Sequence, residues 1–163
     1  MSIKEIISRI ERIRDCEVLP PSGKPTIKDG MLLPPDLYEF YDICGGVRLF
    51  QKSNYKTNIV TPEEFVLANP VIVGEECEED ISSNWYIIAN DGSGEFLTID
   101  LGDKRTGRCY DSFYDRHAVA GESKIIASSF TDLLERIILN KGEYWYWLND
   151  QFDLGDAYDD VEL

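Results

Sequence analysis

The first residues that could do chemistry form an acidic run near the middle of the chain. Within six consecutive positions the run places five carboxylates, at Glu75, Glu76, Glu78, Glu79 and Asp80. Clustered carboxylates can imitate the phosphate spacing of a nucleic acid, and they steer basic proteins onto a surface. The run therefore predicts a contact patch for a basic protein partner. The alternative is a solvated face that binds nothing.

A second group lies near the C-terminus, where an aromatic run is followed by isolated acids. The run is Tyr144–Trp147, and the chain beyond Lys141 contains acids but no Lys or Arg. Aromatic side chains are enriched at binding hot spots, and an acidic rim adds selectivity. The candidates for a partner contact are Trp145, Trp147, Asp150 and Asp153. The alternative is that these rings cover the open face of a sheet.

Residues typical of catalysis are sparse. His117 is the only histidine and no Gly-x-Ser-x-Gly elbow accompanies it, so we expect a structural or surface histidine. The turn Asp91–Glu95 lacks the 12-residue ligand spacing of a calcium loop, and its glycines do not open a phosphate-binding helix. We therefore expect no enzyme, no metal site and no cofactor. A metal-dependent hydrolase using Asp91, Glu95 or Asp100 is a distant alternative.

Composition narrows the class of partner. The 163 residues include 16 Lys and Arg against 31 Asp and Glu, a formal charge of −15 at pH 7. Phosphate binding needs clusters of Lys and Arg, so this balance argues against direct contact with nucleic acid or with an anionic membrane. The hydrophobic content of 43% argues against disorder, and the length fits a single domain over residues 1–163. The net negative charge allows a basic protein as the partner.

The N-terminal segment and the cysteines predict a cytoplasmic location. Charges interrupt Met1–Ile7 every few residues, so this segment lacks the apolar region of a signal peptide. Uncharged stretches fall far short of the roughly 20 apolar residues that a membrane span needs. The wide spacing of the cysteines favours reduced thiols over a disulfide framework or a zinc site. These cysteines are Cys16, Cys44, Cys77 and Cys109.

Helical periodicity and capping residues predict four helices. Ser2, Thr61 and Ser128 or Ser129 are the expected N-caps, because their hydroxyls can accept the first free backbone N–H groups. The Gly45-Gly46 pair is expected to end the second helix. The predicted ranges are residues 2–15, 34–44, 61–69 and 128–139.

Apolar runs between turn residues predict the strands. The turn at residues 90–94 should join two of them into a hairpin, and a turn at residues 102–107 should add a third, giving an antiparallel meander. Trp85 opens the first of these strands and is expected in the core, with the lining of a surface cleft as the alternative. The expected strands are Val47–Phe50, one starting at Val71–Val73, Trp85–Ala89, Glu95–Leu101 and Arg108–Tyr110.

The ordered set of motifs resembles the SUKH superfamily, which includes bacterial immunity proteins and fungal regulators of cell-wall synthesis. The resemblance covers roughly residues 3–140, and its single motifs are weak while their order and spacing are fairly specific. The segments that carry it are Leu33-Pro34-Pro35, Phe40-Tyr41, Gly45-Gly46, Thr61–Phe65, Trp85–Ala89, Asp91-Gly92, Gly94-Glu95, Asp100, Cys109-Tyr110, Ile126-Ala127, Ser129-Phe130 and Leu133-Leu134.

The resemblance implies an α+β fold, with a mostly antiparallel sheet and helices packed around it. It also implies a cytosolic immunity protein that neutralises a polymorphic or contact-dependent toxin, often a nuclease, without a shared catalytic residue. A regulatory or scaffold module that binds a cellular protein is the alternative. The Trp85 strand and the Asp91 turn could rim a binding groove. Residues 141–163 form an aromatic and acidic extension whose last eight or so residues are expected to be loose.

Overall fold

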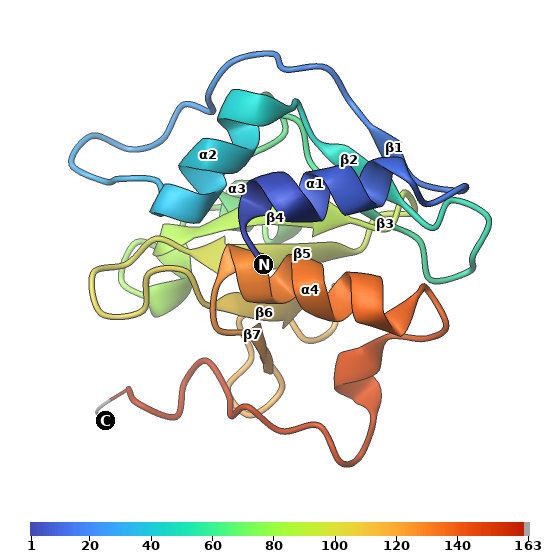
Figure 1. Ribbon diagram of the computed structural model, residues 1–163. Coiled ribbons are helices and arrows are strands. Elements are labelled where there is room, and N and C mark those ends of the chain that lie inside the picture. Colours follow the sequence, from blue (N-terminus) through green and yellow to red (C-terminus); the bar gives the residue numbers. More distant parts are fainter. Residues whose placement is uncertain (162–163) are drawn as a thin grey trace.

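Every strand of the sheet pairs antiparallel with its neighbour in the sequence, so the seven strands lie in the order β1 to β7. The computed structural model describes residues 1–161 (Figure 1). The strands are β1 (Glu17–Val18), β2 (Val47–Leu49), β3 (Thr57–Ile59), β4 (Trp85–Asn90), β5 (Phe96–Asp100), β6 (Cys109–Ser112) and β7 (Ile125–Ala127). The helices are α1 (Ile3–Glu11), α2 (Pro35–Ile43), α3 (Ala68–Ile72) and α4 (Phe130–Asn140), with 3-10 turns η1 (Ile81–Asn84) and η2 (Tyr146–Leu148). The predicted α+β architecture and the meander are confirmed.

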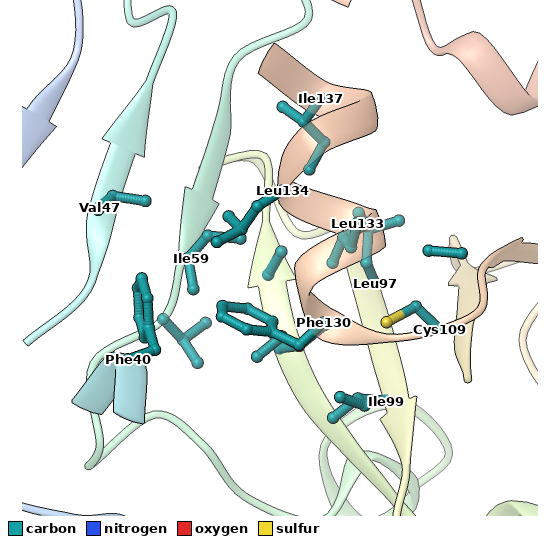
Figure 2. Close-up of a cluster of buried hydrophobic side chains, with 14 of the residues drawn as sticks. Phe40, Val47, Ile59, Leu97, Ile99, Cys109, Phe130, Leu133, Leu134 and Ile137 are labelled. Atoms are coloured by element: carbon teal, nitrogen blue, oxygen red, sulfur yellow. The ribbon is translucent and has the colours of Figure 1, made fainter. Parts of the chain in front are cut away.

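Helices α1, α2 and α4 cover one face of the sheet (Figure 1). Figure 2 shows α4 side chains such as Leu133 and Leu134 above strand residues such as Leu97. The rings of Phe40 and Phe130 meet edge to face with centroids 4.8 Å apart, which joins α2 to α4. This apolar layer is the main core, and burying it is the dominant favourable contribution to folding.

Local side-chain hydrogen bonds fix the starts of α1 and α4 as the sequence predicts, although α1 ends at Glu11 rather than at residue 15. Ser2 accepts the backbone N–H of Glu5 at the start of α1, and Ser129 accepts that of Asp132 at the start of α4. Asp36, in the first turn of α2, accepts both the backbone N–H and the hydroxyl of Thr131. That pair of bonds ties the N-terminal ends of α2 and α4 together.

The predicted helix at Thr61 is wrong, because only one turn forms there. Thr61 and Glu64 bond as a capping pair and the N–H of Phe65 reaches the Thr61 carbonyl. The chain then runs extended, because the Val66 carbonyl accepts the N–H of Ile87 beside β4. Pairing with the sheet therefore prevails over local helix signals.

The predicted strand at Val71–Val73 is also wrong, since α3 occupies Ala68–Ile72. Pro70 is the third residue of this helix rather than its end. The first N–H groups of a helix have no partner within it, so a proline costs nothing there. Strands β1, β3 and β7 were not predicted; they span only two or three residues and carry little periodic signal.

The C-terminal extension is docked along the sheet, and the expectation of a loose end is wrong for the described residues. The N–H of Ile125 donates to the Gly155 carbonyl, and the N–H of Ala157 donates to the Ser123 carbonyl. This pairing covers the open edge of β7, where unpaired backbone groups would otherwise face water. Asp160 also accepts from Arg105 at 3.1 Å. No helix in residues 1–161 combines the length and apolar character needed to cross a bilayer.

Candidate interaction surface

The acidic run lies in a loop, Gly74–Asp80, which we call the acidic loop. Its four glutamates are exposed, and Asp80 is half-buried. The carbonyl of Asn69, at the start of α3, accepts the N–H groups of Val73 and Gly74 at 2.7 and 3.0 Å. The Asn69 side-chain amide also donates to the Glu76 carbonyl at 3.1 Å. One buried asparagine thus holds the backbone that presents the charges to solvent.

Asp80 turns inward and supports the loop. It caps η1 by accepting the N–H of Ser82 at 3.0 Å, and it accepts the hydroxyl of Tyr158 at 2.7 Å. Partial burial acts to raise the pKa of Asp80, but the bonds from Ser82 and Tyr158 outweigh it and hold that pKa below its usual value. The carboxylate that ends the acidic run therefore fastens the loop to the C-terminal extension.

A buried polar chain continues from Asn69 to the sheet through His117. The Nε2 atom of His117 lies 2.6 Å from Asn69 Oδ1, and its Nδ1 atom lies 2.9 Å from the Ser112 hydroxyl. Because Asn69 Oδ1 can only accept, Nε2 carries the proton and Nδ1 accepts from Ser112. Burial lowers the pKa of His117 to about 4, so the ring is neutral at pH 7. The sequence predicts a structural or surface histidine but gives no sign of these partners.

Trp85 lies on the same side of the sheet and is completely buried. Its indole N–H donates to Asp100 at 3.2 Å, and the same carboxylate oxygen accepts the Tyr110 hydroxyl. Ala157 of the extension covers the Trp85 and Tyr110 rings. A side chain with no exposed surface cannot contact a partner, so the structure places Trp85 in the core and not in a cleft.

The carboxylates considered for a metal site are used within the fold. Asp91 accepts the N–H and hydroxyl of Ser93 and the N–H of Glu95, which shapes the hairpin turn. Asp100 is engaged with Trp85, and burial raises its pKa. Within residues 1–161, no three His, Cys, Asp or Glu side chains lie close enough together to hold a metal ion.

The aromatic run of the extension is divided between the core and the surface. Trp147 is 1% exposed, and the hydroxyl of buried Tyr146 donates to the Ile126 carbonyl. Trp145 stacks on Trp147, with centroids 5.4 Å apart, and keeps part of its ring exposed. Tyr144 is 43% exposed. Trp147 therefore supports the surface that Trp145 and Tyr144 present, and it cannot itself contact a partner.

A concave surface of about 350 Å³ opens beside Trp145. We call it the aromatic hollow; its lining residues are Tyr55, Tyr144, Trp145, Leu148 and Asn149. A second hollow of about 380 Å³ adjoins it, shares Tyr144 and Asn149, and includes Glu143 in its wall. Sequence reasoning missed Tyr55, which lies about 90 residues earlier and has no local pattern in common with the extension. Asp150 and Asp153 are exposed on the segment that follows the hollow.

Comparison of the sequence with known proteins identifies the family of the chain. Residues 28–136 match the model of the SMI1 / KNR4 family (SUKH-1). The chain belongs to the SMI1 / KNR4 (SUKH-1) family. It is also similar to a protein named immunity protein YokJ from Bacillus subtilis (strain 168). The two are 55% identical over 164 residues, which cover 100% of this chain and 99% of the relative. No solved structure matches the chain significantly.

The family match includes one of the two candidate surfaces of this SUKH-1 protein and leaves out most of the other. The acidic loop lies inside the matched range, whereas the aromatic run and the acids that follow it lie beyond residue 136. The similarity to the Bacillus relative continues through the extension. The extension is therefore an addition to the part described by the family, and a relative of nearly the same length has one that aligns with it.

Negative charge is concentrated in the segments that carry these surfaces. Residues 57–103 contain eleven Asp and Glu and no Lys or Arg, and residues 142–161 contain six and none. The bond between Asp80 and Tyr158 joins the two segments. A basic protein that approaches these segments would meet many carboxylates, which favours encounter.

Proposed function

We propose that this protein is an immunity protein that binds and neutralises a cognate polymorphic or contact-dependent toxin. The observation that carries the proposal is the 55% identity, over essentially the whole of both chains, to a protein named immunity protein. The matched length includes the acidic loop and the extension, so both candidate surfaces lie within the similarity. Neutralisation here is stoichiometric: the protein covers the toxin and turns over nothing.

The partner that fits this surface is a basic protein. A net charge of −15 and the exposed glutamates of the acidic loop would attract Lys- and Arg-rich surfaces over several ångströms. A nuclease has such a surface because it must bind phosphate, so we propose a nuclease as the toxin class. The carboxylates would then occupy the positions that phosphates take in the toxin's site.

The proposed place of encounter is the cytoplasm. The four cysteines are free thiols, as is usual in a reducing compartment. Two of them, Cys44 and Cys109, are buried, and burial raises the pKa of each thiol. Buried thiols in the protonated form are poor nucleophiles, so these residues act as core side chains rather than as reactive groups.

Capture followed by titration tests the proposal. The tagged chain is incubated with lysate of the cells that produce it, at 0.1 and 1 M salt, and bound proteins are identified by mass. The expected result is one stoichiometric partner that stops growth when expressed in a heterologous host, with growth restored by co-expression of this chain. Toxin activity in vitro should fall linearly to zero at one equivalent, as a tight complex requires.

Three outcomes would contradict the proposal. Several substoichiometric housekeeping partners would favour the regulatory or scaffold alternative. Complete inhibition at far less than one equivalent would indicate that the protein acts as an enzyme. A stoichiometric partner whose toxicity this chain does not relieve would show binding without immunity.

A further inference from the structure

We propose that the aromatic hollow binds an Arg or Lys side chain of the toxin and so determines which toxin is recognised. The inference rests on the proposed immunity function and gives the hollow one occupant, a basic side chain of the partner. Its basis is the combination of exposed rings, neighbouring carboxylates and position outside the family match.

The Trp145 and Tyr55 rings of the hollow are held in place before any partner arrives. Trp145 stacks on buried Trp147 and meets the edges of Phe113 and Tyr55, with centroids 5.4 and 5.2 Å away. Tyr55 and Tyr144 keep 37% and 43% of their surface exposed. A guanidinium or ammonium group is attracted to such ring faces, and rings that need no ordering lose little entropy on binding.

Two carboxylates lie close to the hollow, in a segment, residues 142–161, that contains no Lys or Arg. Glu143 lines the adjoining hollow, and Asp150 is exposed directly after Asn149. Arg136 lines the adjoining hollow too, but it is bound to Asp132 at 3.0 Å and lies over the Phe152 ring. Ring faces flanked by carboxylates fit a long basic side chain, whose methylene stem packs on the rings while its charge meets the rim.

The position of the hollow argues for a role in specificity. Four of its five lining residues lie beyond residue 136, where the family match ends, and Tyr55 completes it from the matched part. Proteins on one fold that bind different partners must differ where they touch them. The acidic loop can attract any basic surface, whereas a shaped hollow selects for a side chain at a particular place.

A peptide titration followed by nuclear magnetic resonance tests the inference without the toxin. The probe is the capped peptide Gly-Arg-Gly-Arg-Gly, and the control peptides carry Glu or Leu in place of Arg. We expect saturable shifts of the Trp145 indole N–H and the Tyr144 ring, with a dissociation constant of about millimolar, as a few weak contacts allow. Neither control peptide should produce them.

Matched variants separate the hollow from the general charge. Tyr144→Ala and Leu148→Ala alter exposed side chains while leaving Trp145 on its support, and each should weaken peptide binding about fivefold. Leu154→Ala, at 41% exposure outside the hollow, should bind as the unaltered protein does. Trp145→Phe keeps an aromatic ring at the centre of the hollow. Peptide binding by this variant checks that a loss of binding in the other variants does not come from unfolding.

The outcomes distinguish this inference from the function on which it rests. Shifts confined to the amides of residues 75–79, absence of any shift, or equal shifts with the Leu peptide would overturn the hollow as a site for basic side chains. If the Arg peptide binds as expected but the capture experiment fails, the hollow stands as a basic-group site and a toxin as its source is rejected.

Discussion

The acidic loop and the aromatic hollow are both exposed, but the fold supports them in opposite ways. Beneath the loop lies a chain of buried hydrogen bonds through Asn69 and His117. Beneath the hollow lie stacked and edge-to-face rings, Trp145, Trp147 and Phe113. The loop therefore presents charges from a polar scaffold, and the hollow presents ring faces from an apolar one.

This difference assigns the two surfaces to different steps of binding. Charge acts over about a Debye length of 8 Å at physiological salt, so the loop should act mainly on the association rate. Ring contacts act only when surfaces touch, so the hollow should act mainly on the dissociation rate.

Phe113→Ala should remove the apolar support of the hollow. Phe113 is 8% exposed and its ring contacts both Trp145 and Trp147. Deleting a buried phenylalanine ring typically costs about 3–4 kcal/mol of unfolding free energy, which urea denaturation would measure. The matched control is the neighbouring Tyr114→Ala, whose side chain is 75% exposed and whose loss should cost under about 0.5 kcal/mol. Equal effects of the two changes would contradict the packing described here.

Acid should weaken the polar support of the loop. The pKa of His117 is about 4 in the folded protein, against 6.5 for a free side chain, so the unfolded state binds more protons between these values. Stability from this group is present above pH 6.5 and falls as the pH drops towards 4, by up to about 3 kcal/mol. Urea denaturation across this range should show the fall, and His117→Gln should reduce it. A flat profile in the unaltered protein would contradict the neutral buried ring.

Reversing the charge of the acidic loop should slow association without changing dissociation. Glu75, Glu76, Glu78 and Glu79 are changed together to Lys, and the partner is the protein recovered by capture. We expect association about tenfold slower at low salt, a loss of about 1.4 kcal/mol, and a flatter dependence on salt. Stopped-flow fluorescence measures both.

The control for this experiment moves the same charge elsewhere on the surface. Four exposed acids outside the two acidic segments are reversed together: Glu5, Glu11, Glu39 and Glu122. If this variant slows association as much as the loop variant does, net charge rather than the loop accounts for steering. If neither variant changes the rate or its salt slope, the loop is not part of the encounter surface.

Tyr158→Phe should have the smallest effect, because it removes one hydrogen bond between the extension and the loop. The Tyr158 hydroxyl donates to Asp80 at 2.7 Å while its ring packs near Trp85. We expect a loss of about 1 kcal/mol or less, with faster amide hydrogen exchange in Ser82. Unchanged exchange there would show that the extension does not fasten the loop.

Much of the fold follows from local signals in the sequence. Ser2 and Ser129 cap their helices, and the turn at residues 90–94 joins β4 to β5. Such features need only neighbouring residues, so a sequence can reveal them. The single turn at Thr61 and the pairing of the extension with β7 depend on contacts between distant segments, and no local pattern predicts them.

The candidate site, like the fold, could be predicted only where local signals determine it. The sequence indicates which residue types could bind a partner, but burial decides which of them can reach one. Trp145 and Trp147 are two positions apart and chemically identical, yet only Trp145 has exposed ring surface. Tyr55 enters the hollow only because the chain brings it beside Trp145. Long-range packing thus determines the site, and it cannot be predicted from composition or periodicity.

The most direct test of the hollow's role in binding measures how fast the complex with the captured partner dissociates. Tyr144→Ala combined with Leu148→Ala is compared with the four-glutamate reversal and with unaltered protein, by chasing labelled partner with unlabelled partner. We predict dissociation at least about tenfold faster for the hollow variant and unchanged for the loop variant. Unchanged dissociation of a folded hollow variant would contradict the claim that this immunity protein holds its toxin through the aromatic hollow.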